Sequence, residues 1–318
     1  MSRGKELIKN TGILLIARIS TQMVSFFLLP LYTALLSTSE YGEVDICTSL
    51  TAIILPFMSL CLENGLFRYY IATKEKSDKK KIVSTSFTVI GVVTVLISFS
   101  YLLVTTLIYV RYRFWLIFYY LTKMLATVLL QVCRAQGNNV TYGFSSFLSS
   151  SLSVLFNVIL VAGFHFKVTG ILLSSIIAHM LSIIYMVFKT RIYRFYDIRM
   201  FEYAEAHKLL KYSVPLVFNQ IGSWVINYSD RLLIIYFWGQ GQNGIYSVAN
   251  KFSNILNTFF GVYNVAWTES VVRSINDIDN NSYSSKVFNL TFQIYLIIVT
   301  GIISLLPFFF SLLVNAAY

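Results

Sequence analysis

Charged residues are scarce in this chain. Asp, Glu, Lys and Arg make up 12% of its 318 residues, whereas a soluble globular domain carries about 25%. Hydrophobic residues make up 56%, and the mean hydropathy is +0.67. Because so few charges cannot cover a water-facing surface of this size, the composition disfavours a soluble enzyme and a disordered chain and favours an integral membrane protein.

Cysteine and histidine are also few, with three residues of each. Cys47, Cys61 and Cys133 lie far apart in or beside apolar stretches, a pattern that predicts neither a disulfide framework nor a zinc site. The histidines are scattered, and we find no nucleotide-binding glycine loop and no catalytic triad. The sequence therefore predicts no enzyme, no metal and no cofactor.

Apolar stretches long enough to cross about 30 Å of hydrocarbon recur along the chain. Nine qualify or nearly qualify: 13–36, 46–66, 83–109, 114–132, 143–163, 168–188, 213–237, 244–267 and 289–313. We therefore expect an all-α integral membrane fold of about nine transmembrane helices, with short outer loops of which the longest is 37–45.

The positive charges fix the expected orientation. Of the 25 Lys and Arg residues, 18 fall on the inner side and 3 on the outer side when the N-terminus is placed inside, as the retention of cations in the cytoplasm requires. The sequence predicts a multi-pass protein of a cytoplasmic membrane with a cytoplasmic N-terminus. The net charge of +11 is spread in short clusters between apolar runs, so no nucleic-acid partner is expected.

A weak internal repeat divides the chain. Leu7-Ile8-Lys9 matches Leu209-Leu210-Lys211, which places the seventh span opposite the first in the same direction. Parallel repeats of this kind build secondary transporters with a site between two halves. We expect a six-helix lobe over 1–200 and an incomplete, three-helix lobe over 201–318. We expect truncation; the alternatives are that another chain supplies the missing helices or that the repeat is a coincidence.

Several strings carry a family resemblance. They are Pro30-Leu31-Tyr32-Thr33, Glu40-Tyr41-Gly42, Glu63-Asn64-Gly65-Leu66-Phe67-Arg68-Tyr69-Tyr70, Tyr212-Ser213-Val214-Pro215-Leu216, Ser229-Asp230-Arg231-Leu232 and Gly244-Ile245-Tyr246-Ser247-Val248-Ala249-Asn250-Lys251. In this order the chain resembles the bacterial polysaccharide-unit flippases of the multidrug, oligosaccharidyl-lipid and polysaccharide exporter superfamily. The resemblance implies two lobes around a central cavity that opens alternately to each side.

The resemblance also implies the substrate, an undecaprenyl-diphosphate-linked oligosaccharide repeat unit used for O-antigen, lipopolysaccharide or capsule synthesis in the bacterial inner membrane. Membrane lipids and other proteins of surface-polysaccharide assembly are the further partners that it implies. The alternatives are a multidrug antiporter, a peptidoglycan-precursor flippase, a polytopic glycan polymerase and an inactive truncated remnant.

Two cations inside the predicted spans are the leading candidates for binding an anionic substrate. Arg18 and Lys123 interrupt otherwise apolar segments, and a cation at mid-bilayer depth costs about 2.5–3.5 kcal/mol unless it faces protein or water. Both are predicted to line a cavity and neutralise a diphosphate. The alternatives are an intramembrane ion pair or a side chain that reaches the interface.

Polar side chains at helical spacing accompany these cations. The remaining predicted substrate-binding residues are Gln22, Asn219, Gln220, Trp224, Asn227, Asn250, Lys251 and Asn254. Under this interpretation the amides form hydrogen bonds with sugar hydroxyls and Trp224 stacks on a sugar ring. The alternative is that these polar residues join helices to one another.

Four charged residues near span ends are candidates for a gate or for ion coupling: Glu63, Arg68, Asp230 and Arg231. Pairing of Asp230 with Arg231, or placement of either residue at the interface, is the simpler interpretation.

Overall fold

The computed structural model describes residues 28–274, 280–315 and 318. The expectation of an all-α membrane protein is confirmed, because the described residues form helices and no strand. The elements are α2 (Leu29–Leu35), α3 (Thr38–Ser49), α4 (Thr51–Ser59), α5 (Leu62–Ala72), α6 (Lys76–Leu107), α7 (Arg113–Ala135), α8 (Asn139–Asn157), the π-helix η1 (Val158–Gly163), α9 (Lys167–Thr190), the 3₁₀ turns η2 (Ile192–Arg194) and η3 (Ile198–Met200), α10 (Tyr203–Ser274) and α11 (Asn280–Leu313).

Six helical segments in the described part of the chain are long and apolar enough to cross a membrane. They are Thr38–Ser59, Lys76–Leu107, Arg113–Ala135, Asn139–Gly163, Lys167–Thr190 and Phe288–Phe308. Most of the expected first span lies outside the described residues. The expected seventh and eighth spans both lie in α10, on either side of Gly239, whose φ of 85° breaks the helix.

The second predicted span differs from expectation at both ends. The segment 37–45, expected as a loop, is helical because the Ser37 hydroxyl accepts from the backbone N–H of Glu40 while the Glu40 carboxylate accepts from that of Ser37, a capping box that starts α3. The span then breaks between α4 and α5, where Leu60 and Cys61 adopt φ values of 50° and 54°. Two successive left-handed residues without glycine form a strained bend.

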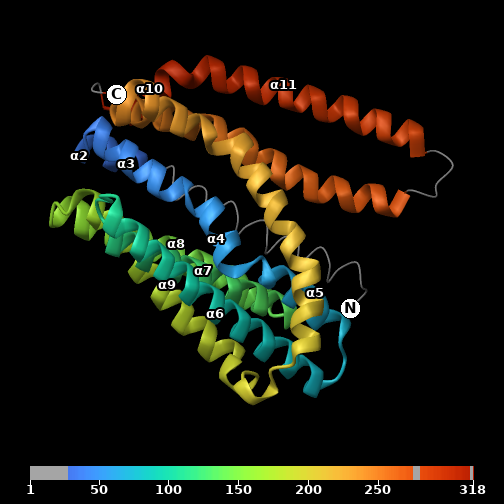
Figure 1. The fold of residues 1–318 in the computed structure, drawn as a ribbon. Helices are drawn as coiled ribbons and strands as arrows, with labels where there is room; N and C mark the ends of the chain where they lie inside the picture. Colours follow the sequence, from blue (N-terminus) through green and yellow to red (C-terminus); the bar gives the residue numbers. More distant parts are fainter. Residues whose placement is uncertain (1–27, 275–279, 316–317) are drawn as a thin grey trace.

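Helices α6 to α9 run side by side as a bundle, with α3, α4 and α5 along one flank (Figure 1). Leu62, Leu129, Val132 and Leu172 are fully buried between these helices. The first half of α10 rises along α3 to α5, and its second half runs with α11 away from the bundle (Figure 1). Apolar side chains on the outside of α6, such as Phe99, are exposed and face the hydrocarbon of a membrane.

Candidate functional site

A polar cavity of about 450 Å³ lies among α2, α3, α7, α8 and α9, and the second half of α10 closes one side of it. We call it the serine-lined cavity. Seven of its lining residues are serines: Ser145, Ser146, Ser149, Ser150 and Ser153 of α8, and Ser175 and Ser182 of α9. Spacings of three and four residues on α8, and of seven on α9, place each set on one face of its helix, so the sequence itself turns these hydroxyls inward together.

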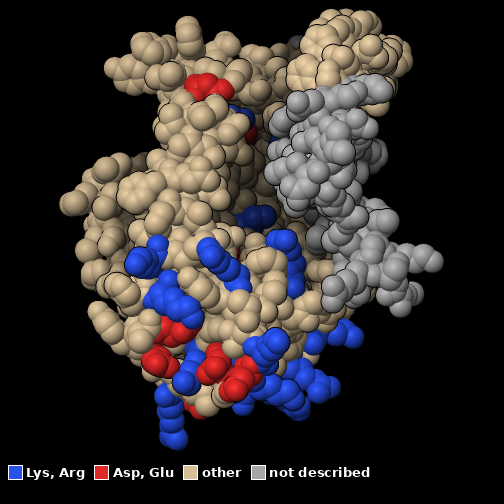
Figure 2. Space-filling model, turned by 90° about the vertical axis from the view of Figure 1, so that its right-hand side faces the viewer, with Lys and Arg blue, Asp and Glu red and all other residues tan. Residues whose placement is uncertain are grey.

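Two lysines reach the same cavity from different helices. Lys123 lines it from α7 and Lys251 from α10. Neither forms an ion pair with any residue that the structure describes. Figure 2 shows Lys and Arg atoms deep inside a hollow, well above the basic side chains gathered at the lower end of the molecule. The cavity therefore holds positive charge that the described side chains leave free for an anion.

Histidine and tyrosine side chains complete the wall beside Lys123. His179 Nδ1 lies 3.1 Å from the Ser149 Oγ, and the imidazole stacks on the Tyr119 ring with 6.2 Å between ring centroids. Elsewhere in the lining, Tyr32 and Tyr41 pack together with ring centroids 6.1 Å apart. All these residues line the cavity, so hydroxyl, imidazole and aromatic groups surround the free ammonium groups.

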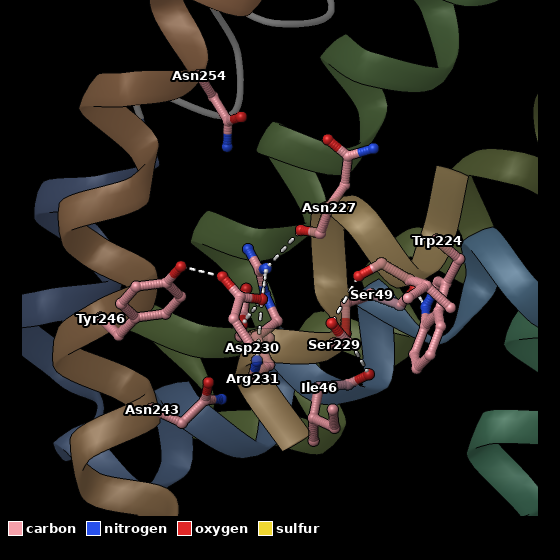
Figure 3. Close-up of polar contacts among 12 residues, drawn as sticks. Ile46, Ser49, Trp224, Asn227, Ser229, Asp230, Arg231, Asn243, Tyr246 and Asn254 are labelled. Atoms are coloured by element: carbon pink, nitrogen blue, oxygen red, sulfur yellow. Dashed lines mark hydrogen bonds and ion pairs between the residues drawn. The ribbon is translucent and has the colours of Figure 1, made fainter. Parts of the chain in front are cut away.

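An ion-pair network joins α3 and α10 beside the cavity, at the lining residue Asp45. The Arg231 guanidinium is 5% exposed and donates from Nε to the Asp45 carboxylate of α3 at 2.8 Å. Its Nη1 donates to Asp230 at 3.2 Å and to the Asn227 carbonyl at 3.0 Å, and the Tyr246 hydroxyl donates to Asp230. Figure 3 shows Asp230, Arg231 and Tyr246 converging from the two halves of α10.

Backbone packing joins the same helices next to this network. A Cβ atom on Gly42 of α3 would overlap the Gln240 carbonyl, and one on Gly244 of α10 would overlap the Thr38 carbonyl. The buried Asn243 amide donates to the Gly42 carbonyl at 3.1 Å. Only glycine permits this approach, so α3 and α10 form a close-packed seal, which we call the glycine contact.

The structure places the predicted substrate-binding residues in three groups. Lys123 and Lys251 meet in the cavity, as described above. Asn219, Gln220 and Asn227 are exposed along the first half of α10, and Asn250 and Asn254 are half-buried on its second half, outside the cavity lining. Figure 3 shows Asn254 on the same side of the network as Asn227. Arg18 and Gln22 lie outside the described residues.

Trp224 is buried, unlike the nearby residues Asn219, Gln220 and Asn227, which are exposed. Its indole Nε1 donates to the Ser49 carbonyl at 3.2 Å (Figure 3). The ring is 8% exposed and ties α10 to α3, so in this structure it is not presented to a sugar.

The two other gate candidates lie apart from the network. Arg68 is exposed at the end of α5, with its guanidinium carbon 4.4 Å from the centroid of the Tyr212 ring of α10. Glu63 is half-buried just after the α4–α5 bend and accepts from the Asn64 amide at 3.2 Å. Its other oxygen is buried and has no hydrogen-bond partner among the described residues.

Sequence reasoning missed Asp45, His179 and the serine face of α8. Asp45 sits in a segment expected to be a loop, and His179 was grouped with scattered histidines. The period of the α8 serines is visible in the sequence, but serine is common in membrane helices as a helix-joining residue, so the period alone does not distinguish a cavity from a helix contact.

Comparison with known proteins identifies the family to which the chain belongs. Residues 7–268 match the model of the family described as polysaccharide biosynthesis protein. An uncharacterised membrane protein of Haemophilus influenzae is 22% identical over 268 residues, which cover 82% of this chain and 64% of the relative. The chain thus spans about 64% of the length of this relative.

Solved transporters share the fold. An inward-facing multidrug resistance MATE family transporter of the MOP superfamily superposes with a TM-score of 0.69 at 14% identity, covering 92% of this chain and 74% of that one. A Vibrio cholerae MATE transporter superposes with a TM-score of 0.58 at 15% identity, covering 85% and 68%. At 14–15% identity, this structural likeness shows the fold alone.

Proposed function

Because this multi-pass membrane protein belongs to the polysaccharide biosynthesis protein family, we propose that it flips undecaprenyl-diphosphate-linked oligosaccharide repeat units across the bacterial cytoplasmic membrane. The units would serve surface polysaccharide synthesis, and transport would proceed by alternating access. The observation that carries this proposal is the pair of lysines, Lys123 and Lys251, that share one cavity and form no ion pair with any residue that the structure describes.

The physical problem of such transport is to move a diphosphate through hydrocarbon. An isolated charge loses its hydration there at a cost of many kcal/mol unless fixed opposite charges replace the water. Lys123 and Lys251 provide those charges from α7 and α10. Because the two lysines stand on helices of the two expected lobes, an anion bound between them draws the lobes together, and this links binding to lobe movement.

The glycine contact and the Asp45–Arg231 pair close the end of the cavity that the lysine distribution of the sequence places outside. The lipid-linked glycan therefore enters from the cytoplasmic side. Opening the outer end requires α3 and α10 to separate, which breaks this pair. Asp230 and Arg231 accordingly act as a gate, and the exposed Asn219, Gln220 and Asn227 contact glycan outside the cavity.

An exporter of organic cations is the second candidate, since Asp45 lines the cavity. A cation site needs a free carboxylate, but the Asp45 Oδ2 lies 2.8 Å from the Arg231 Nε. The proposal for an anionic substrate follows from the charges that remain unpaired.

The test is a pair of matched substitutions in cells that depend on this gene for surface glycan. Lys123→Met and Lys251→Met keep the length of the side chain and remove its charge, so each is expected to abolish surface glycan while membrane abundance stays unchanged. Lys189→Met is the control, because Lys189 is exposed in the last turn of α9. Normal surface glycan in both cavity variants would overturn the proposal.

A further inference from the structure

The serine-lined cavity contains more hydrogen-bonding groups than the binding of a phosphate uses. On α8 and α9, Ser149, Ser175 and Ser182 face the same space as Lys123 and His179. The Ser175 hydroxyl donates to the carbonyl of Ile171 in its own helix at 3.0 Å, and that of Ser182 donates to the Ser145 carbonyl of α8 at 3.1 Å. A hydroxyl that donates in this way keeps both of its lone pairs free to accept. The wall is therefore rich in acceptors as well as in donors.

One of these hydroxyls has no partner. Ser145 lines the cavity with a relative exposure of 0%, and its Oγ makes no hydrogen bond with any residue that the structure describes. A buried hydroxyl left unpaired costs about 1–3 kcal/mol. Because it has no exposed surface, this hydroxyl lies behind the cavity wall, and the hydroxyls open to a ligand are those of the half-buried Ser146, Ser149, Ser150 and Ser175.

The side chains around Lys123 suit a sugar ring attached to a phosphate. The buried Tyr119 ring holds the half-buried His179 imidazole at the wall by stacking on it, and an aromatic face of this kind packs against the C–H face of a pyranose by apolar contact. The serine hydroxyls lie on two other helices and meet the sugar hydroxyls at the edge of the ring. Lys123 lies on α7, four residues after Tyr119, and lines the same cavity, where its ammonium group binds the phosphate.

The dimensions limit how much of a lipid-linked glycan fits. From Ile171 to Ser182, both in the lining, α9 rises about 16 Å. The volume of about 450 Å³ lies in the lower half of the range of about 300–1,000 Å³ found for small-molecule pockets. One sugar with its phosphate fits this space, whereas a repeat unit of several sugars does not.

We infer that the serine-lined cavity is a subsite for a single glycosyl phosphate, the lipid-proximal end of the glycan. Lys123 binds its phosphate, and the serine faces of α8 and α9 together with His179, which Tyr119 positions, bind its sugar ring. The remaining sugars extend outside the cavity along the exposed amides of α10. This inference rests on the proposed function and specifies which part of the substrate the protein recognises.

The experiment measures protection of a cavity thiol in the purified full-length protein, reconstituted in nanodiscs. Ser149→Cys places a thiol in the subsite, and Ser77→Cys is the matched control, exposed in the first turn of α6. The native cysteines are buried, and the protein without an added cysteine gives their background. The probes are N-acetylglucosamine 1-phosphate, inorganic phosphate, N-acetylglucosamine and a polyprenyl-diphosphate-linked N-acetylglucosamine.

We expect N-acetylglucosamine 1-phosphate to slow maleimide labelling of Ser149→Cys and to leave Ser77→Cys unaffected. Inorganic phosphate and the free sugar each lack half of the contacts and should require at least about tenfold higher concentrations. Lys123→Met in the Ser149→Cys protein should abolish the protection. The lipid-linked probe should act at lower concentration than the soluble one, which identifies the membrane as the source of the ligand.

Equal protection by inorganic phosphate and by the glycosyl phosphate would overturn the sugar subsite, and so would equal protection before and after Lys123→Met. Absence of labelling in the ligand-free protein would also overturn it, because the cavity would then be closed to water. Ser153→Cys repeats the measurement should Ser149→Cys not fold. Protein that flips lipid-linked glycan in vesicles but shows no protection refutes the subsite alone, whereas protection without flipping refutes the proposed transport.

Discussion

Gly244→Ala should prevent α3 and α10 from closing at the outer end. The added methyl group would overlap the Thr38 carbonyl, a backbone atom that no rotamer change can move. Overpacking of this kind costs about 1–3 kcal/mol. Because the overlap exists only while the two helices touch, the whole penalty falls on the closed state and shifts the equilibrium towards the open one by about 5-fold to 150-fold.

Labelling from the outer side measures this shift. Val44 lines the cavity and is 7% exposed, so Val44→Cys reports whether the glycine contact is open. In vesicles with the outer face exposed, a membrane-impermeant maleimide should label it about 5-fold to 150-fold faster when Gly244→Ala is present.

Gly241→Ala is the control for this experiment. It lies one turn earlier in the same helix, and its Cβ would meet the Thr38 Oγ1 at an ordinary 3.5 Å. The control should label at the parental rate. Equal rates for Gly244→Ala and Gly241→Ala would refute the reasoning, since both carry the same gain in helix propensity and differ only in the overlap.

Further substitutions test the contacts that hold α3 in place, each by the melting temperature of the purified protein. Arg231→Met removes the charged hydrogen-bond partner of the half-buried Asp45 and should destabilise by about 1.5–3 kcal/mol, whereas adding Asp45→Asn should recover most of the loss; equal melting temperatures for the single and double variants would contradict this. Trp224→Phe removes one interhelical hydrogen bond and should cost about 0.5–1.5 kcal/mol, and an unchanged value would show that the bond contributes nothing. Ser37→Ala removes the cap of α3 and should cost about 0.5–2 kcal/mol, while Ser39→Ala, exposed in the same turn, should have no effect.

The fold class could be predicted from the sequence because lipid imposes a simple rule. Uncharged stretches such as 83–109 satisfy their backbone hydrogen bonds only as helices, and α6 lies over this range. The second span resisted prediction because its limits depend on local backbone geometry. The capping box at Ser37 extends the helix into an expected loop, and the left-handed pair Leu60–Cys61 interrupts the apolar run at a point where the sequence has no glycine.

The candidate site, like the fold, could be predicted only in part. A lysine such as Lys123 in an apolar span can be recognised from the sequence, because placing its charge in hydrocarbon costs free energy. The sequence cannot show which partner a charge will meet: Asp45 and Arg231 stand 186 positions apart and pair only after packing. Trp224 has the sequence neighbours of a polar stripe, yet it packs against α3, because helix rotation is set by tertiary contacts.

Gly239 is a single non-helical residue between the two halves of α10. Arg231 precedes it and Lys251 follows it, so a change in the angle between the two halves at this residue would move the partner of Asp45 relative to the cavity lysine. We therefore expect loss of the contact with α3 and displacement of the Lys251 ammonium group to occur together.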